Sequence, residues 1–308
     1  MTPRLRHLTT LEHLPRGCIE RLLDRAITMR DACAHGTRKL DLLAGRTVLN
    51  LFFEPSTRTR TSFELAARRL GADVINFEIG FSSTAKGEEL LDTLHTLEAM
   101  HLDAIIVRHK VSGTPEELVR HAMSGVSVIN AGDGNHAHPT QGLLDALTIR
   151  QHRPDFENLT VAICGDVKHS RVARSDVHAF TTLGVKELRV CGPAALMPTP
   201  DELPNCRFFD DFDAAIEGVD AVIMLRLQKE RMSSTDLPDE TAYFKRYGLD
   251  TRRLARAARG CLVMHPGPIN RGIEIASDVA DGAQSRILEQ VGNGVFVRMA
   301  VLSEVLAR

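Results

Sequence analysis

The chain passes from a strand pattern into a helix pattern within Val48-Leu49-Asn50-Leu51-Phe52-Phe53-Glu54-Pro55-Ser56-Thr57-Arg58-Thr59-Arg60. The first residues of this stretch, up to Phe53, form a nearly continuous apolar run, which is typical of a buried strand. Apolar side chains then recur at helical spacing up to Gly71, namely at Phe63, Ala66, Ala67 and Leu70. The polar residues of the stretch therefore fall where a strand ends and a helix begins.

This junction has the chemistry of an anion site. Ser56 lies near the expected N-cap of the helix. A helix start offers N–H groups without an intrahelical partner and the positive end of the macrodipole, to which Thr57, Arg58 and Thr59 would add further donors. The pattern predicts a phosphate site, and a capped helix with solvated arginines is the alternative.

Apolar runs of strand length recur along the chain, most of them separated by helical patterns. They lie at residues 73–77, 103–107, 127–130, 159–164, 187–191, 219–225 and 261–264. Such alternation is typical of α/β proteins with mainly parallel sheets, whose ligands bind at the carboxyl ends of the strands. A polar stretch with a proline follows the helix expected over residues 139–150, so we expect the domain junction there.

The composition is that of an ordinary globular protein. The 308 residues exceed a typical single core, and 43% are apolar and 25% charged, so two domains are expected. The formal net charge of −2 predicts no nucleic-acid partner. No apolar run approaches a membrane span, and residues 1–7 lack the apolar core of a secretion signal, so a cytoplasmic protein with no membrane partner is expected. The six cysteines form no Cys-x-x-Cys pair, which favours reduced thiols over zinc or disulfides.

Polar residues follow other strand patterns in the first half. Arg108 comes directly after one apolar run, and Lys86 lies in a polar loop of small residues. His138-Pro139-Thr140-Gln141 opens a helix whose start is fixed by proline. Such a position favours a neutral imidazole at His138 that donates to a carbonyl, while Gln141 suits an uncharged amide. Alone, each group also fits a solvated residue, a plain loop or a helix cap.

In the second half of the chain, polar residues again follow strand patterns. Gly165-Asp166-Val167-Lys168-His169-Ser170-Arg171 leaves a strand, but it lacks the spaced glycines of a dinucleotide site, so NAD binding is not expected. Arg171 and Arg226 follow two strand patterns and suit a dicarboxylate held by bidentate pairs. His265-Pro266-Gly267-Pro268 forms a turn poor in N–H groups, whose carbonyls could accept from an NH2 group. A purely structural turn is the alternative.

Together and in this order, the motifs resemble those of aspartate carbamoyltransferase catalytic chains, in the aspartate/ornithine carbamoyltransferase superfamily. The resemblance spans nearly the whole sequence. It implies an α/β fold of two domains, each a mainly parallel β-sheet flanked by helices. The expected parts are a carbamoyl phosphate-binding domain over residues 1–151, an aspartate-binding domain over 152–290, and a C-terminal part over 291–308 whose helix, about 294–306, packs back on the first domain.

The resemblance also implies the activity. The enzyme would transfer the carbamoyl group of carbamoyl phosphate to the amino group of L-aspartate, in de novo pyrimidine (UMP) biosynthesis, without a metal or organic cofactor. The family is trimeric, so a homotrimer is expected in which the Lys86 loop reaches a neighbouring chain's site. A regulatory chain, a dihydroorotase partner or neither remain open.

Roles for individual residues follow from the same resemblance. The reacting groups would be Arg58, Thr59, Arg108 and His138. Carbamoyl phosphate would be bound by Ser56, Thr57, Arg58, Thr59, Arg108, His138, Gln141, Pro266, Gly267 and Pro268. Aspartate would be bound by Lys86, Arg171, Arg226 and Gln228. Which of Ser82 and Ser83 joins Lys86 stays open, because Ala85 fills a position that is polar in many relatives.

For the reaction that the resemblance implies, residue chemistry favours a direct transfer. The amine of aspartate would attack the carbamoyl carbon, and donors from Thr59, Arg108 and His138 would stabilise the resulting oxyanion. The sequence shows no clear Ser-His-Asp or Cys-His arrangement, so a covalent intermediate is not expected. Ornithine carbamoyltransferase is the nearest rival, but its His-Cys-Leu-Pro turn and Ser-Met-Gly loop are replaced here. A non-catalytic subunit would be expected to lack some of the phosphate or carbonyl ligands, all of which this chain has.

Overall fold

The computed structural model describes residues 4–34, 39–78, 90–123, 125–229 and 239–306. It divides into two compact units. The first unit comprises Met1–Leu143 and Asn293–Arg308, and the second comprises Leu144–Gly292. The division falls inside two helices, α5 (Pro139–His152) and α11 (Ile287–Leu306).

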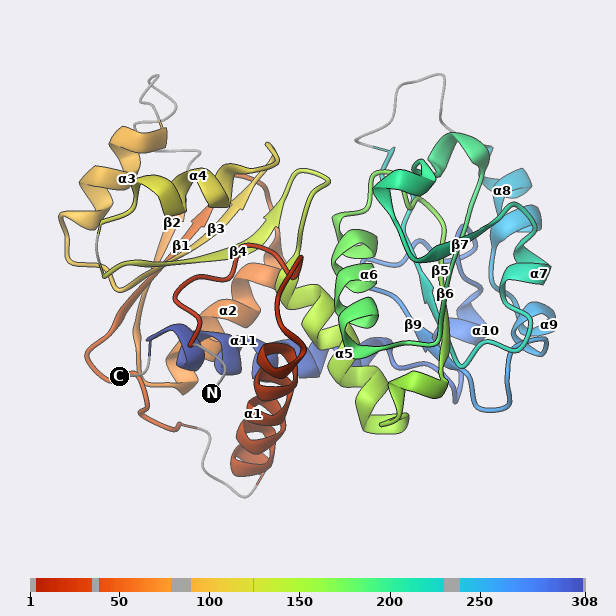
Figure 1. Cartoon of the computed structure of the whole chain (residues 1–308), viewed down its shortest axis with the longest axis horizontal. Coiled ribbons are helices and arrows are strands. Elements are labelled where there is room, and N and C mark those ends of the chain that lie inside the picture. Colours follow the sequence, from red (N-terminus) through yellow and green to blue (C-terminus); the bar gives the residue numbers. More distant parts are fainter. Residues whose placement is uncertain (1–3, 35–38, 79–89, 124, 230–238, 307–308) are drawn as a thin grey trace. The chain divides into compact units, whose positions relative to one another are not determined.

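The first unit is built around a parallel sheet of four strands in its described part (Figure 1). The strands are β1 (Thr47–Phe52), β2 (Asp73–Glu78), β3 (Ala104–His109) and β4 (Ser127–Asp133), in the order β2-β1-β3-β4. The other helices of this unit are α1 (Arg16–Ala34), α2 (Thr57–Arg69), α3 (Leu90–Glu98) and α4 (Thr114–His121). Helices α3 and α4 cover one face of the sheet, while α2 and the C-terminal part of α11 lie on the other.

The second unit is built around a parallel sheet of five strands in its described part. The strands are β5 (Thr160–Cys164), β6 (Glu187–Cys191), β7 (Cys206–Phe209), β8 (Ala221–Met224) and β9 (Leu262–Met264), in the order β7-β6-β5-β8-β9. The helices are α6 (Arg171–Leu183), α7 (Phe212–Ala215), α8 (Glu240–Tyr247), α9 (Thr251–Leu254) and α10 (Ser277–Ala280), with short 3-10 helices at Phe156–Asn158, Ala194–Leu196 and Pro200–Glu202.

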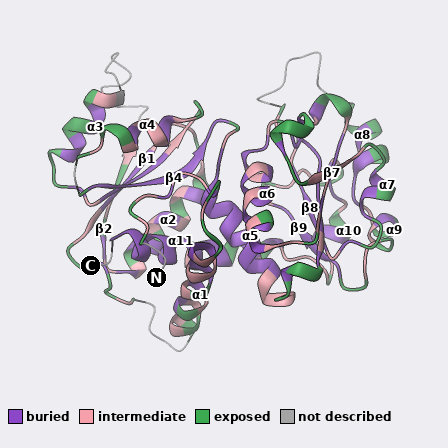
Figure 2. Ribbon diagram, viewed as in Figure 1, coloured by how far each residue is buried: buried purple, intermediate pink, exposed green. Residues whose placement is uncertain are grey.

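The predicted fold class is confirmed. Every strand pair in the two described sheets is parallel, and the central strands are buried on both faces, as Figure 2 shows. The C-terminal helix returns to the first unit, where Arg298 lies over the ring of Phe63 and Ser127 donates to the carbonyl of Val305. All six cysteines are free. No described helix combines the length and hydropathy that a membrane crossing requires.

Two local expectations differ from the structure. Helix α11 begins at Ile287 rather than near residue 294. Its first turns carry exposed apolar side chains, Leu288 and Val291, so the apolar pattern there does not mark one buried face. Strand β7 was not expected because it is a short edge strand with no fully buried residue.

Candidate active site

Three segments with polar side chains begin at one edge of the first unit's sheet. Phe52 at the end of β1 lies opposite Arg108 in β3, and Val107 lies opposite Asn130 in β4. The Ser56 motif follows β1, Arg108 is the second-last residue of β3, and His138 follows β4 after a turn. The carboxyl ends of neighbouring parallel strands lie at the same edge of a sheet, so the three segments start side by side at the ends of β1, β3 and β4.

The start of α2 is not capped by its own serine. Ser56 is the N-cap residue, yet its hydroxyl makes no capping hydrogen bond. Thr57 and Arg58 are exposed, whereas the side chain of Thr59 is buried with 8% of its surface accessible. A serine that does not cap its own helix keeps its hydroxyl available for a ligand at the positive end of the helix.

Arg108 is held in place by its neighbours. Its Nη1 donates to the carbonyl of Ala131 at 3.2 Å, and its Nε lies 3.4 Å from Oε2 of Glu54. The two charged side chains are mostly buried, with 13% and 22% of their surfaces exposed. The guanidinium is therefore oriented in advance, and an entering phosphate would share it with the Glu54 carboxylate.

The segment after β4 places His138 and Gln141 at a helix start. Pro139 is the first residue of α5, and the carbonyl of His138 accepts the N–H groups of Gln141 at 2.9 Å and Gly142 at 3.3 Å. Both side chains are buried, with exposed fractions of 4% for His138 and 8% for Gln141. The imidazole and the amide thus lie at the positive end of α5, where donors to a carbonyl are favoured.

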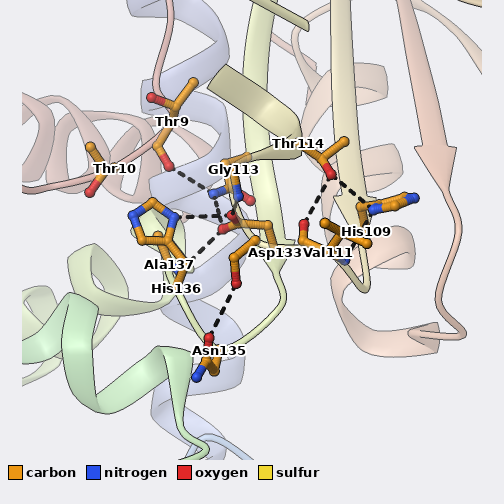
Figure 3. A network of polar contacts seen from close by, with 12 residues as sticks. Thr9, Thr10, His109, Val111, Gly113, Thr114, Asp133, Asn135, His136 and Ala137 are labelled. Atoms are coloured by element: carbon orange, nitrogen blue, oxygen red, sulfur yellow. Dashed lines mark hydrogen bonds and ion pairs between the residues drawn. The ribbon is translucent and has the colours of Figure 1, made fainter. Parts of the chain in front are cut away.

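The turn before His138 is braced by Asp133, whose role the sequence analysis missed (Figure 3). This buried carboxylate accepts hydrogen bonds from Gly113 N at 2.7 Å, Asn130 Nδ2 at 2.7 Å, Ala137 N at 3.1 Å and His136 Nδ1 at 3.0 Å. Burial would raise the pKa of Asp133, but the hydrogen bonds that it accepts outweigh burial and hold this pKa below its usual value. An aspartate in a glycine-rich turn is the sequence signal that could have identified it.

The same region contains a cluster with potential metal ligands. Within the described ranges, Glu116, Asp133 and His136 have ligand atoms within 4.8 Å of one another. Both oxygens of Asp133 already accept hydrogen bonds from the loop and its neighbours, and the hydrogen bond to Asp133 raises the pKa of His136. We therefore interpret this group as a brace of the loop.

His109 also has a structural role. Its Nδ1 accepts the N–H of Val111 at 3.1 Å and lies 2.9 Å from the hydroxyl of Thr114. Burial lowers its pKa, and its ring packs edge-on against Phe53. These contacts join the end of β3 to the loop before α4.

In the second unit, polar groups follow the adjacent strands β5 and β8. Arg171 is the first residue of α6 and is buried, and Arg226 follows β8. Asp166 lies fully buried in the segment between β5 and Arg171, and it accepts the N–H of Gln228 at 3.1 Å. A Cβ at Gly165 would lie 2.6 Å from the carbonyl oxygen of Leu225, so glycine permits the close approach of the two segments.

The turn after β9, the strand next to β8, has a defined hydrogen-bond pattern. The N–H of Gly267 donates to Nδ1 of His265 at 2.8 Å, and the N–H of His265 is bound by Gln290 at 2.9 Å. Pro266 and Pro268 have no N–H, and the Gly267–Pro268 bond is cis. Because its N–H groups are used or absent, this turn can offer a ligand only backbone acceptors.

Some predicted site residues lie outside the described residues. These are Lys86, with the alternatives Ser82 and Ser83 in the same loop. Thus the described part of the first unit brings the Ser56 motif, Arg108, His138 and Gln141 to one sheet edge. The second unit brings Arg171, Arg226, Gln228 and the turn at residues 265–268 to the ends of three neighbouring strands.

Two family models together match nearly the whole chain. Residues 6–151 match the aspartate/ornithine carbamoyltransferase carbamoyl-P binding domain, and residues 157–305 match the Asp/Orn binding domain of the same family. The chain belongs to the aspartate/ornithine carbamoyltransferase family.

Relatives within this carbamoyltransferase family cover the chain end to end. The aspartate carbamoyltransferase catalytic subunit of Xanthomonas campestris pv. campestris (strain B100) is 59% identical over 304 residues, 98% of this chain and 96% of the relative. Aspartate transcarbamoylase from Trypanosoma cruzi, solved with carbamoyl phosphate and aspartate, superposes with a TM-score of 0.87 at 32% identity and covers 100% of both chains. Ornithine carbamoyltransferase from Pyrococcus furiosus superposes with a TM-score of 0.89 at 25% identity, covering 99% of both chains. The fold alone therefore does not distinguish the two acceptors.

Proposed function

We propose that this carbamoyltransferase transfers the carbamoyl group of carbamoyl phosphate to the amino group of L-aspartate, giving N-carbamoyl-L-aspartate and phosphate for pyrimidine biosynthesis. The observation that carries the choice of acceptor is the pair of arginines, Arg171 and Arg226, that follows the adjacent strands β5 and β8. Two guanidiniums suit the two carboxylates of aspartate, whereas ornithine carries a cationic side chain. The full-length likeness to aspartate carbamoyltransferase catalytic subunits supports the same acceptor.

The residues of the first unit would bind carbamoyl phosphate. The start of α2, with Ser56, Thr57, Arg58 and Thr59, supplies phosphate donors, and Arg108 adds a guanidinium. Gln141 and the backbone acceptors of the turn at residues 265–268 suit the carbamoyl NH2 group. Residues 1–151 would thus form the carbamoyl phosphate-binding domain, residues 152–290 the aspartate-binding domain, and residues 291–308 the returning helix.

Catalysis would depend on positioning and on stabilising developing charge. As the amine attacks, the carbamoyl oxygen becomes an oxyanion, and Thr59, Arg108 and His138 are the donors proposed to stabilise it. Loss of one such donor typically costs about 3 kcal/mol in the transition state. The amine proton passes to the departing phosphate, and Arg58 stabilises the charge on that leaving group.

Lys86, Arg171, Arg226 and Gln228 would bind aspartate in a homotrimer with shared sites, where Lys86 comes from a neighbouring chain. The hydrogen bond from Gln228 N to Asp166 supports this role, because it fixes the segment after Arg226 next to the segment before Arg171. Cytoplasmic location and any regulatory or dihydroorotase partner stay predictions from the sequence.

A carbamoyl transfer assay that offers aspartate and ornithine side by side tests the proposal. We expect carbamoyl-aspartate to form more than about a hundredfold faster than carbamoyl-ornithine, because a site built for a second carboxylate leaves buried charges unpaired when a cation enters. Formation of carbamoyl-ornithine without carbamoyl-aspartate would show that aspartate is not the acceptor. Absence of both products, despite bound carbamoyl phosphate, would favour a non-catalytic subunit.

A further inference from the structure

One buried side chain of α11, Gln290, holds the turn at residues 265–268. Its Oε1 accepts the backbone N–H of His265 at 2.9 Å, and its Nε2 donates to Oδ1 of Asp145 at 2.6 Å. Gln290 is 2% exposed and Asp145 is fully buried. A donor on one side and a carboxylate on the other permit only one orientation of the amide, so Gln290 links the turn to α5 in a fixed geometry.

The ring of His265 continues this link on the other side of the turn. Its Nδ1 accepts the N–H of Gly267 at 2.8 Å, so the ring proton is on Nε2, which faces Oε1 of Glu274 at 3.2 Å. His265 is 1% exposed and Glu274 is fully buried. The same Glu274 oxygen accepts the N–H of Asn270, which ties the chain after the turn to the same carboxylate. The turn at residues 265–268 has two backbone N–H groups, those of His265 and Gly267, and both are held by hydrogen bonds.

The far end of the link is a pair of buried carboxyl groups. Asp176 on α6 is fully buried, and its burial, together with the neighbouring charge of Asp145, raises its pKa well above the usual value. The raised pKa favours the protonated form of Asp176, and Asp145 accepts the hydrogen bond of the Gln290 amide. Asp145 also lies four residues after Gln141 on α5, which is one helical turn.

We propose that Gln290 is a positioning residue that aims the carbonyls of the 265–268 turn at the NH2 group of carbamoyl phosphate. The inference rests on the proposed function, because it needs the carbamoyl group to be the ligand of this turn. Gln290 acts through His265 and not on the substrate. Hydrogen bonds weaken steeply when their angle or length changes, so a turn released from Gln290 would lose recognition of the NH2 group while the phosphate site stays intact.

Acetyl phosphate provides the direct probe, because it keeps the phosphate and the carbonyl of carbamoyl phosphate but has a methyl group in place of NH2. The measured quantity is the ratio of the Kd of acetyl phosphate to the Kd of carbamoyl phosphate, from calorimetric titration of the full-length protein. We expect a clear preference for carbamoyl phosphate in the wild type. In Gln290→Met, which has a similar volume but neither hydrogen bond, we expect this ratio to fall by about tenfold with the Kd of acetyl phosphate unchanged.

Two further variants complete the test. Gln290→Asn is shorter by one methylene and cannot span both partners, so it should lose the preference even if Gln290→Met does not fold. Leu288→Gln adds an amide on the exposed side of the same helix and should match the wild type, since Leu288 is 85% exposed.

The outcomes separate this inference from the proposed function. If folded Gln290→Met or Gln290→Asn keeps the wild-type ratio, Gln290 does not position the turn, and this result leaves the proposed carbamoyl transfer to aspartate untouched. If both Kd values rise equally, the effect is structural and the inference is also wrong. If the wild type forms carbamoyl-aspartate but shows no preference for carbamoyl phosphate, the turn does not bind the NH2 group. If the wild type forms no carbamoyl-aspartate, the proposed function itself fails.

Discussion

At the scale of single residues, Thr59 has the environment that a charge-stabilising hydroxyl needs. It is buried, while its neighbours Thr57 and Arg58 on the same helix turn are exposed. A hydroxyl kept from bulk water interacts more strongly with a developing charge than a solvated one, because the surroundings have a lower dielectric. Thr59 lies in the first turn of α2, which follows β1, and the last residue of β1, Phe52, pairs with Arg108 of β3 at the sheet edge where carbamoyl phosphate is proposed to bind.

We therefore expect Thr59→Val to lower kcat by about a hundredfold or more, since valine has nearly the same shape but no donor for the oxyanion. Thr61→Val is the matched control, because Thr61 lies exposed on the same helix. Steady-state formation of carbamoyl-aspartate measures both. A kcat for Thr59→Val within about threefold of the control would exclude the hydroxyl from transition-state stabilisation.

The residues that the sequence could identify are those whose chemistry is local to a motif. Ser56 at a helix start and His138 before Pro139 carry their context beside them in the chain. The supporting residues differ in this respect. Asp133 had a local signal in its glycine-rich turn, and only its partner Gly113 is distant in sequence. Gln290 had none, because both its partners, Asp145 and His265, are distant, and a buried amide has no sequence pattern of its own when tertiary contacts alone define it.

At the scale of elements, continuous apolar runs identified the central strands because these are buried on both faces. The edge strand β7 was missed for the opposite reason. Its residues are only partly buried, and Arg207 covers the ring of Phe209 at 4.8 Å. The start of α11 was placed too late, and its first turns expose Leu288 and Val291, so the apolar pattern there does not mark one buried face.

The contact of α1 with α11 depends on one buried carboxylate, Glu304. It accepts hydrogen bonds from Arg21 Nε at 3.1 Å, Arg21 Nη2 at 2.8 Å and Arg25 Nη1 at 2.8 Å. The Glu304 side chain is only 5% exposed, whereas the arginine side chains are 33% and 38% exposed. The two helices lie far apart in sequence, so this carboxylate ties the C-terminal helix to the first unit.

We expect Glu304→Ala to lower the free energy of unfolding by about 1–2 kcal/mol. The loss is smaller than for a fully buried pair because the arginines can be solvated once the carboxylate is removed. The control is Glu20→Ala, which breaks the exposed pair of Glu20 with Arg16 on α1 and should cost less than about 0.5 kcal/mol. Urea unfolding followed by circular dichroism measures both losses. Equal losses for the two variants would show that the buried contact stabilises the protein no more than the exposed pair does.

At the scale of the whole molecule, the proposed homotrimer requires two chains to complete each active site, so a single chain would be inactive. Each site would combine His138 of one chain with Lys86 of its neighbour. Sequence patterns could suggest the residues but not their assembly, because composition and periodicity report what a chain buries within itself and not which copy supplies a group. Activity is the property that depends on the arrangement between chains.

Mixing two inactive variants, Lys86→Ala and His138→Ala, therefore tests the assembly. In an equal random mixture about three quarters of the trimers contain both variants, and the cyclic arrangement gives each of these one intact site, so about a quarter of the wild-type activity should return. If both groups came from the same chain, every site would lack one of them and the mixture would stay inactive. Subunit exchange is verified by recovering both chains through a tag carried by one of them. No activity in a mixture with verified exchange would rule out the shared site and leave the carbamoyl transfer proposal to be judged by the acceptor assay.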